Sequence, residues 1–563
     1  MEGNLVADLA RRADTYGWRD RPLYHSGDST LTHGQIHDAG ARAAGVLRSA
    51  GVREGHRVLI ALPDSAAFVA ALLGTLRLGA VAVLTGPEQS EDEHAYVLGD
   101  AAPQAVVCAE RLVRRFPSVH VLTGDDLGDE PVRVPEPVAV APGAPAYVQY
   151  TSGTTGKPKG VVHRHTDPET YVRAMAVGAL GMTASDVTFS LSKACYPYGL
   201  GATVFFPMTC GGSAVLWPDA PTVEGAVEQA RRHRPTLLFT VPTWYARLVS
   251  AADPRAVRDA FGSLRAAASA GEPLLPSLAA RIEESLGCPV LDGLGSTEVG
   301  HTFVSNTVTR RRAGTLGVVL APYEIEVRAE SPSTLYGAAG SGGGARAGTG
   351  ERGALYVRGP SVMTEYFGMP ERTAEALDAD GWLRTGDLVH LDADGFVHHH
   401  GRILDQVTVS GERVLPLEVE RILGRHPGVV EVAVVADAGG GGTLSAYVVI
   451  EEGLQATRGL ERELLGLARD RLPEHKVPRS VTFMTELPRT STGKIRRGLL
   501  SRSADGSFPC PAPPPRARPD GPAPPCPEGA AEGSGAGSSA SGAGSAAVER
   551  QPCRPGEGRP GPG

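Results

Sequence analysis

Apolar runs of two lengths alternate along the first 330 residues of the chain. The short run at 58–62 suits a β-strand, and the longer apolar segment at 65–78 suits a buried helix. The same pairing recurs where 236–240 precedes 242–250, and Pro242 stands where a proline favours the start of a helix. Repeated strand–helix units predict an α/β fold, with a large N-terminal domain of layered βα subdomains whose mostly parallel sheets are covered by helices.

The pattern changes near residue 400. Residues 1–400 form the predicted N-terminal domain, and 401–502 form a small α+β C-terminal domain with two strands between two helices. A Gly/Ala/Ser run within 331–350 predicts a disordered surface insertion. The stretch 503–563 contains no Leu or Ile and predicts a disordered Pro/Gly/Ala/Ser-rich tail, because it cannot bury enough apolar surface to fold. An interaction tail and a translation artefact of GC-rich DNA are both compatible with that composition.

Composition narrows the classes of function. The 563 residues are 41% hydrophobic and 21% charged, as in soluble globular proteins, and the net charge of −8 argues against a nucleic-acid partner. The longest apolar region, 58–84, is interrupted by Pro63, Asp64 and Arg77, so no membrane span is expected. Seven cysteines without metal or disulfide spacing, and an N-terminus without an apolar signal core, favour the cytoplasm.

A segment rich in glycines and hydroxyls follows the strand predicted at 146–150. It comprises Thr151, Ser152, Gly153, Thr154, Thr155, Gly156, Lys157, Pro158 and Lys159. Glycines let backbone N–H groups approach an anion, hydroxyls add donors, and ammonium groups neutralise charge. The spacing is not that of a Walker A loop, since Pro158 stands where a Ser or Thr would bind magnesium. The segment therefore predicts a phosphate-binding loop rather than a solvated turn.

Lysine is rare, although the chain holds 55 Lys and Arg residues together. Its five lysines are Lys157, Lys159, Lys193, Lys476 and Lys494. Because a compact ammonium and a planar guanidinium are not interchangeable, a lysine in an arginine-rich chain indicates a site that needs the former. Two of the five lie in the predicted phosphate loop, and one ends a second Thr-Gly-Lys segment.

Further loop-like segments place reactive side chains after predicted strands. In chain order they are Gly271-Glu272, Asp292-Gly293-Leu294-Gly295-Ser296-Thr297-Glu298, Thr385-Gly386-Asp387, Gly401-Arg402, Ser410-Gly411 and Thr492-Gly493-Lys494. Each alone is compatible with a turn. Together with the phosphate loop, and in this order, they resemble the adenylate-forming superfamily of acyl-CoA ligases, peptide-synthetase adenylation domains and luciferases. The resemblance spans roughly residues 5–500.

Within that superfamily, several segments resemble benzoate-CoA ligase and related aryl-CoA ligases. They are Val161-Val162-His163-Arg164-His165, Ser192-Lys193, Tyr198-Gly199-Leu200-Gly201, Phe206-Pro207-Met208 and the stretch from Asp292 to His301. The resemblance implies that an aromatic carboxylate attacks the α-phosphate of Mg²⁺-bound ATP, giving an acyl-adenylate. A thiol, expected to be that of coenzyme A, then displaces AMP.

The resemblance also implies the roles of individual residues. Lys494, Glu298 and Thr151 are the expected catalytic residues, with Glu298 holding Mg²⁺ and Lys494 bridging the carboxylate and the α-phosphate. The remaining ATP-binding residues are expected to be Ser152, Gly153, Thr154, Thr155, Gly156, Lys157, Lys159, Gly271, Glu272, Asp292, Gly293, Leu294, Thr297, Asp387 and Arg402. The expected acyl pocket comprises Lys193, Tyr198, Gly199, Val299, Gly300 and His301, and Gly411 is expected to border the pantetheine path.

Two positions depart from the family pattern. Leu294 stands where many members carry an aromatic residue, so adenine would pack against an aliphatic side chain. Leu404 stands at the usual Asp position of the hinge that makes the C-terminal domain mobile, with Asp405 one place later, so the hinge residue stays open. The small Val299-Gly300 pair follows Glu298 and predicts an enlarged pocket, suited to a substituted or larger aryl acid.

The acceptor of the acyl group stays open at the level of sequence. It could instead be the phosphopantetheinyl arm of an acyl carrier protein, because that arm and coenzyme A present the same thiol. A catalytically idle nucleotide-binding homologue is a further hypothesis, disfavoured by Lys494, Glu298 and Asp387, and a homodimer is a candidate oligomeric state.

A few conspicuous side chains have interpretations that do not involve the reaction. The histidines at 398–400 are interpreted as a surface β-turn rather than a metal site. Lys193 is either a pocket cation or a partner of Asp186 or another neighbour, and Lys476 is interpreted as a solvated loop residue. His163, beside the phosphate loop, could form a hydrogen bond either with a backbone group or with a bound ligand.

Overall fold

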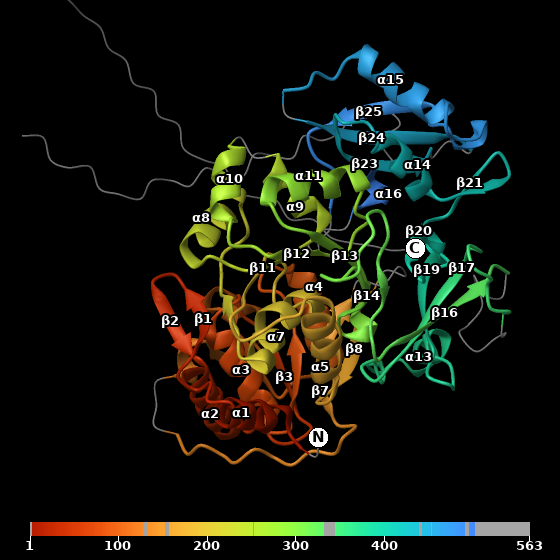
Figure 1. Cartoon of the computed structure of the whole chain (residues 1–563). Helices are drawn as coiled ribbons and strands as arrows, with labels where there is room; N and C mark the ends of the chain where they lie inside the picture. The colour runs from red at the N-terminus through yellow and green to blue at the C-terminus, as the bar shows by residue number, and fades with distance from the viewer. Residues whose placement is uncertain are drawn as a thin grey trace, which may run out of the picture. The chain divides into compact units, whose positions relative to one another are not determined.

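The computed structural model describes residues 3–128, 132–151, 157–250, 253–331, 344–437, 442–451, 453–489 and 495–500. They lie within one unit, Met1–Gly506, which contains two large sheets, a four-stranded sheet and a small C-terminal sheet with their helices (Figure 1). The predicted α/β fold is confirmed. The expected tail at 503–563 and most of the expected insertion at 331–350 lie outside the described residues.

The first large sheet has seven strands. Their spatial order is β18 (Glu365–Tyr366), β8 (Lys159–Arg164), β7 (Pro145–Thr151), β4 (Val81–Leu84), β3 (Arg57–Ala61), β5 (Ala105–Cys108) and β6 (His120–Thr123). Neighbours from β7 to β6 are parallel, whereas β8 is antiparallel to both β7 and β18. The associated helices are α1 (Leu5–Thr15), α2 (His33–Ser49), α3 (Ala66–Arg77), α4 (Glu91–Ala101), η1 (Glu110–Arg115) and η2 (Asp125–Leu127).

Strand β3 shows why this sheet carries helices on both faces. Val58 and Ile60 belong to a core shared with α2 and α3, whereas Leu59 and Ala61 belong to a second core with α4 and η1. Successive side chains of a strand alternate between faces, so an uninterrupted apolar strand needs cover on both sides. The strand–helix–strand unit predicted over 58–84 is confirmed.

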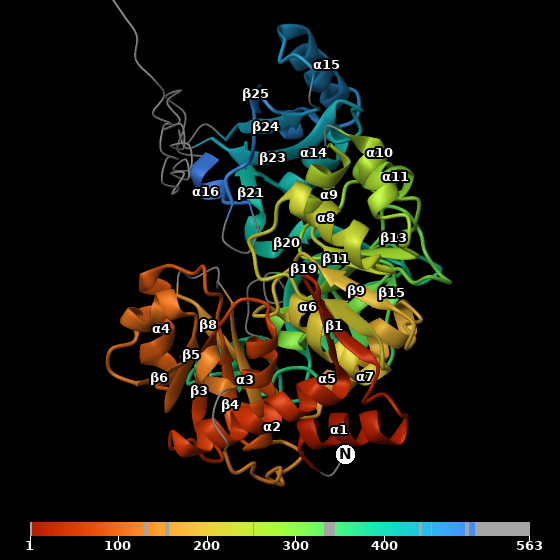
Figure 2. The same ribbon diagram turned by 90° about the vertical axis from the view of Figure 1, so that its left-hand side faces the viewer.

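The second large sheet has nine strands and repeats this construction. Their spatial order is β15 (Val318–Val319), β14 (Thr302–Ser305), β13 (Val290–Gly295), β12 (Ala266–Ser269), β11 (Leu237–Thr240), β9 (Val187–Ser190), β10 (Ser213–Val215), β1 (Pro22–Ser26) and β2 (Ser29–Thr32). One face is covered by α8 (Val223–His233), α9 (Pro242–Val249), α10 (Pro254–Ala260) and α11 (Pro276–Leu286). The core of the other face includes residues of α5 (Asp167–Tyr171), η3 (Val172–Ala179), α6 (Pro197–Leu200), η4 (Gly201–Phe205) and α7 (Phe206–Cys210). Figure 2 shows the two large sheets apart from one another, with β3 and β5 in one and β11 and β9 in the other.

A four-stranded antiparallel sheet follows, with the order β16 (Glu324–Ala329), β17 (Gly353–Arg358), β19 (Leu383–Leu391) and β20 (Val397–Arg402). Between β17 and β19 lies α13 (Pro370–Ala376). Ala345 and Ala347, at the end of the expected insertion, form backbone hydrogen bonds with β16 at 2.9 and 2.8 Å. The β19–β20 ladder matters for the site, because it pairs Asp387 with Arg402.

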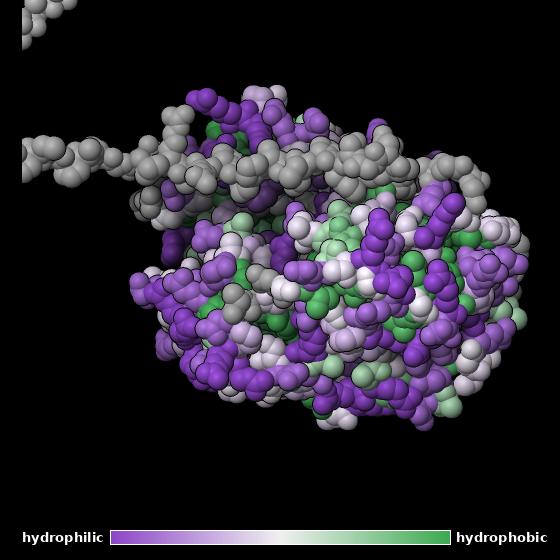
Figure 3. Space-filling view, turned by 90° about the horizontal axis from the view of Figure 1, so that it is seen from above, coloured by the Kyte–Doolittle hydropathy of each residue, from purple (hydrophilic) through white to green (hydrophobic). Residues whose placement is uncertain are grey.

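The C-terminal elements form a small α+β layer. They are β21 (Val407–Val409), β22 (Glu412–Val414), α14 (Pro416–Leu423), β23 (Val429–Ala436), β24 (Leu444–Ile450), α15 (Arg458–Arg469), η7 (Glu474–Lys476), β25 (Ser480–Met484) and α16 (Arg497–Leu500). β23, β24 and β25 form one sheet, and β21 pairs with β22. The molecular face in Figure 3 carries mostly hydrophilic residues with apolar ones interspersed. Within the described ranges, no helix has the length and apolarity needed to cross a bilayer.

Candidate active site

The two described ends of the predicted phosphate loop belong to the paired strands β7 and β8. Thr151 is the last residue of β7 and pairs with Lys159, the first residue of β8, while Lys157 is exposed just before β8. The hairpin register therefore brings the two ends of the segment together. Ser152, Gly153, Thr154, Thr155 and Gly156 lie outside the described residues, as does Lys494, so their roles stay predictions.

Tyr366 joins two of the predicted residues and was missed by the sequence reasoning. Its hydroxyl donates a hydrogen bond to Glu298 Oε1 at 2.8 Å, and Lys159 Nζ lies 4.0 Å from the centroid of its ring. Burial lowers the pKa of Lys159, and the nearby Glu298 carboxylate opposes that shift. β18 carries Tyr366 to this place by pairing with β8, a contact between strands about 200 residues apart that no local motif announces.

Hydrogen bonds to its backbone carbonyl groups fix the short turn η5 (Thr297–Val299), which carries Glu298. The Glu298 carbonyl accepts from Met363 N at 2.7 Å, and the Val299 carbonyl accepts from Ser361 Oγ at 2.8 Å. His163 Nε2 lies 2.7 Å from the Thr297 carbonyl oxygen, while its Nδ1 lies 3.0 Å from Asp167 Oδ2. His163 thus contacts the backbone of the residue that precedes Glu298 and helps to hold the turn in place. A carboxylate oxygen in this setting is a hard ligand of the kind that Mg²⁺ prefers.

Asp387 and Arg402 form a charged pair across β19 and β20. Arg402 Nε and His399 Nε2 each lie 3.3 Å from Asp387 Oδ1. Burial alone would raise the pKa of Asp387, but the Arg402 charge and the His399 hydrogen bond lower it to about 2. The buried carboxylate is therefore ionised at neutral pH and can accept hydrogen bonds from hydroxyl groups.

The expected adenine-bordering residues lie just after the end of β12 and within β13. These parallel strands pair Ser269 with Asp292, whose pKa burial raises well above its ordinary value. Glu272 Oε2 accepts from Thr243 N at 3.1 Å and from Thr243 Oγ1 at 2.6 Å. Gly271 precedes it with a φ of +89°, a backbone conformation that favours glycine. A Cβ on Gly293 would lie 2.8 Å from the Val304 carbonyl oxygen, so β14 approaches β13 closely there, while the next residue, Leu294, is half-buried.

Aromatic rings surround His301 in the expected acyl pocket. Its ring centroid lies 4.8 Å from that of Phe206, 5.2 Å from Tyr198 and 5.7 Å from Tyr171. Its Nε2 lies 3.2 Å from the Tyr198 carbonyl oxygen, and burial lowers the pKa of His301 to about 3, so the ring is neutral. The Tyr198 hydroxyl and His301 Nδ1 are buried without a hydrogen-bond partner among the described residues.

Gly199 and Gly300 both lie where a side chain would meet close neighbours. A Cβ on Gly199 would lie 2.2 Å from the Lys193 carbonyl oxygen. Gly300 has a φ of +88°, and a Cβ there would lie 3.2 Å from both His163 Cε1 and Tyr171 Cδ1. A side chain at position 300 would therefore crowd these two rings. The expectation that Gly300 itself enlarges the pocket is accordingly corrected.

Lys193 binds backbone carbonyl groups of a neighbouring segment. Its Nζ donates to the carbonyl oxygens of Trp217 and Asp219, both at 2.7 Å. Asp186 pairs with Arg265 at 2.7 Å, so of the alternatives left open for Lys193 the pair with Asp186 is excluded. Lys476 was also misinterpreted, because its ammonium pairs with Glu418 at 2.5 Å and is not a solvated loop group.

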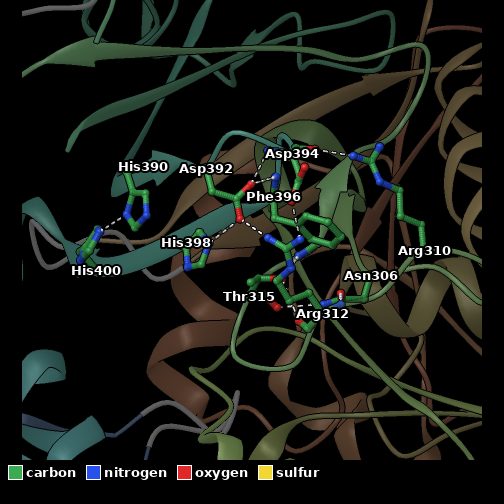
Figure 4. A network of polar contacts seen from close by, with 11 residues as sticks. Asn306, Arg310, Arg312, Thr315, His390, Asp392, Asp394, Phe396, His398 and His400 are labelled. Carbon is green, nitrogen blue, oxygen red and sulfur yellow. Dashed lines mark hydrogen bonds and ion pairs between the residues drawn. The ribbon is translucent and has the colours of Figure 1, made fainter. Parts of the chain in front are cut away.

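The three consecutive histidines lie in strand β20, so the surface-turn interpretation was wrong. His390 Nδ1 lies 2.7 Å from His400 Nε2, and His398 Nε2 lies 3.0 Å from Asp392 Oδ2. Figure 4 marks both contacts with dashed lines. Alternation sends His399 to the opposite face, toward Asp387. Within the described ranges, no group of three or more His, Cys, Asp or Glu is arranged to hold a metal ion.

Gly411 lies at the tip of the β21–β22 hairpin. Its φ is +85°, and a Cβ there would have no heavy atom within 4 Å. Glycine at this tip allows the tight turn, and a larger side chain would project into open space.

Comparison with known proteins gives consistent matches. Residues 9–367 match the model of an AMP-binding enzyme, and 418–494 match the AMP-binding enzyme C-terminal domain. The chain is 41% identical to the p-hydroxybenzoic acid–AMP ligase FadD22 of Mycobacterium tuberculosis, over 89% of this chain and 69% of that protein. It is 32% identical to the 4-hydroxybenzoate–CoA/benzoate–CoA ligase of Rhodopseudomonas palustris, over 88% and 93%.

Solved structures agree with these matches. The chain resembles a benzoate CoA ligase from Burkholderia xenovorans LB400 with a TM-score of 0.80 and 31% identity, over 88% of this chain and 99% of that one. It resembles the anthranilate CoA ligase AuaEII in complex with anthranoyl-AMP with a TM-score of 0.81 and 28% identity, over 89% and 97%.

Proposed function

The chain belongs to the family of AMP-binding enzymes, and we propose that it activates an aromatic carboxylic acid with ATP and passes the acyl group to coenzyme A. The observation that carries this proposal is the convergence of five side chains from four different strands and one turn, namely Lys159, Glu298, Tyr366, Asp387 and Arg402. Arg402 joins the two groups of contacts, because Asp387, Glu298 and Tyr366 all raise the pKa of its guanidinium. In the first step a carboxylate oxygen bonds to the α-phosphorus while the bond to pyrophosphate breaks. In the second step a thiol sulfur bonds to the acyl carbon, the bond to AMP breaks, and the thiol proton is released.

Charge is the main obstacle in the first step, because a carboxylate approaches a polyanion. The phosphate loop and Lys159 would hold the β- and γ-phosphates, and Glu298 would hold Mg²⁺, which neutralises phosphate charge when bound. Preorganised cations and donors at the developing charge supply several kcal/mol in such reactions, or about 10²–10³ in rate for one strong donor. Asp387, kept ionised beside Arg402, would accept hydrogen bonds from the ribose hydroxyls.

The chemistry of the pocket supports an aromatic acid with a polar ring substituent. Flat apolar rings and a neutral His301 suit a benzene ring, since aromatic side chains offer large contact areas without charge. The unpartnered Tyr198 hydroxyl and His301 Nδ1 would gain a partner from a ring hydroxyl. The names of the relatives point the same way, because FadD22 and the Rhodopseudomonas ligase are both described for hydroxybenzoates. We therefore expect a hydroxybenzoate to be preferred over benzoate.

The acceptor has a second candidate. The relative FadD22 is described as an AMP ligase, which leaves a carrier-protein phosphopantetheinyl arm as an alternative to coenzyme A. Gly411 would border the thiol path for either acceptor, because the arm is the same. ATP and coenzyme A are intracellular metabolites, so we propose a cytoplasmic location; a homodimer stays a prediction.

Two coupled assays test the function. ATP–pyrophosphate exchange is measured with benzoate, 3- and 4-hydroxybenzoate, 4-methylbenzoate and hexanoate, with Lys494→Ala as the inactive control. Thioester formation is then measured with coenzyme A and with a phosphopantetheinylated carrier protein. Exchange driven by hexanoate but by no aryl acid would refute the proposed substrate class, and a thioester on the carrier alone would reassign the acceptor.

A further inference from the structure

Arg489 connects the C-terminal part of the chain to the segment expected to border adenine. Its Nη1 donates to Glu272 Oε1 at 3.0 Å, and its Nη2 donates to Glu431 Oε1 on β23 at 2.7 Å. The three side chains are 13%, 12% and 17% exposed, so the ion pairs are largely shielded from water. We propose that Arg489 is a positioning residue for the adenylate-forming step, holding the C-terminal part against the adenine-bordering segment while Lys494 is needed there.

The partner of Arg489 on the N-terminal side is itself fixed. Glu272 Oε2 accepts two hydrogen bonds from Thr243, at 3.1 Å from the backbone and 2.6 Å from the hydroxyl. The other oxygen, Oε1, faces Arg489. A guanidinium presents its donors in a rigid fork, so the angle between two such bonds is set as well as their length. The two bonds therefore fix the orientation of Glu431 on β23 relative to Glu272, as well as holding the two segments together.

The backbone of Arg489 is fixed in the same place. Arg489 and Ile495 form an antiparallel bridge, and Arg496 N donates to the Pro488 carbonyl at 2.7 Å. Lys494 directly precedes Ile495 in the sequence. Arg489 and Ile495 flank the segment that carries Lys494. The bridge between them therefore links both ends of that segment to the residue whose side chain binds Glu272.

A second ion pair across the same boundary lacks this shielding. Arg247 approaches Glu486 only to 3.8 Å, with side chains 46% and 67% exposed. Exposed pairs contribute little, whereas removing one member of a shielded pair leaves a charge without its partner. Without Arg489, Glu272 and Glu431 would both lose their guanidinium partner, although Glu272 would keep its two hydrogen bonds from Thr243. Arg247 therefore offers a matched control at the same boundary.

This inference rests on the proposed two-step function. The first step needs Lys494 at the α-phosphate, and the second needs Gly411 at the thiol path. Both residues lie in the C-terminal part. In this structure Arg489 binds Glu272 of the adenine-bordering segment, whereas a Cβ on Gly411 would meet no heavy atom within 4 Å. We therefore expect the loss of Arg489 to affect the first step selectively.

The test compares Arg489→Met, Arg489→Lys and Arg247→Met in the full chain, with melting curves as a folding check. Pyrophosphate exchange reports the first step, and thioester formation from supplied aroyl-adenylate reports the second. We expect Arg489→Met to lower exchange by about 30-fold or more, as for a truncated shielded charge pair, and to leave the second step within about 3-fold. Arg489→Lys, which keeps the charge without the fork, should fall between Arg489→Met and wild type, and Arg247→Met should resemble wild type.

Two outcomes would overturn the proposal: unchanged exchange in Arg489→Met, or an equal loss of both steps, which would mark a purely structural role. If Arg489→Met does not fold, the single variants Glu431→Gln and Arg489→Lys allow the same comparison between pyrophosphate exchange and thioester formation. Small-angle scattering with ATP provides a readout that needs no acid. A wild-type and variant pair with identical scattering would also contradict the proposal, whereas a wild type that exchanges with no aryl acid would refute the proposed function alone.

Discussion

Tyr366→Phe removes a single hydroxyl from the cluster that contains Glu298. The hydroxyl lies 2.8 Å from Glu298 Oε1, and the ring packs 4.0 Å from Lys159 Nζ. Phenylalanine keeps the ring and therefore the contact with the ammonium. The substitution isolates the hydrogen bond that orients the carboxylate expected to bind Mg²⁺.

The expected loss of activity in Tyr366→Phe follows from the type of hydrogen bond that is removed. A hydrogen bond to a charged group contributes about 1.5–3 kcal/mol, and Tyr366 is almost fully buried, so water does not replace the lost donor easily. That range corresponds to roughly 10- to 150-fold. We expect kcat/KM for pyrophosphate exchange to fall within it, and the Mg²⁺ concentration for half-maximal activity to rise.

The assay is exchange at a series of Mg²⁺ concentrations, combined with calorimetric titration of Mg²⁺ with ATP. Tyr245→Phe is the matched control, since its hydroxyl is also buried and donates to the Ala268 carbonyl at 2.9 Å, away from Glu298. The control should lose stability and keep its Mg²⁺ dependence. A Tyr366→Phe enzyme with the Mg²⁺ dependence of wild type would refute the assigned role.

Three further substitutions test other parts of the site. Gly411→Leu should leave exchange nearly intact and block thioester formation, and an unchanged thioester yield would place the thiol path elsewhere. Gly300→Leu should slow adenylation of every acid without changing the order of preference among the acids. A φ of +88° costs a non-glycine residue about 1–3 kcal/mol, and the new side chain would meet His163 and Tyr171. A shift of preference toward benzoate would contradict this prediction. Asp387→Asn tests the lowered pKa in urea unfolding. Since that pKa falls from 3.8 to about 2 on folding, the carboxylate stabilises the fold above pH 4 and this contribution, about 2 kcal/mol, is lost as pH falls through 2. The difference in unfolding free energy between wild type and variant should shrink accordingly, and a constant difference from pH 5 to pH 2 would count against it.

The sequence by itself determined the elements whose causes are local. An apolar run of strand length followed by one of helix length defines β3 and α3, because alternation and helical periodicity act within a few residues. The clustering of glycines and hydroxyls between Thr151 and Lys159 likewise marks a loop, and the structure joins its two ends in one hairpin. The order of such segments was enough to indicate the family.

The tertiary structure alone decided which side chains meet across long separations. Tyr366 and Glu298 are 68 positions apart, and Arg489 and Glu272 are 217 apart, so no window of sequence contains both partners. The same holds for Lys193, whose ammonium binds carbonyl groups more than 20 residues away. Burial decides these contacts, because a charged group removed from water must find a partner wherever the packed chain provides one, and that place is set by sheet order rather than by neighbours in sequence.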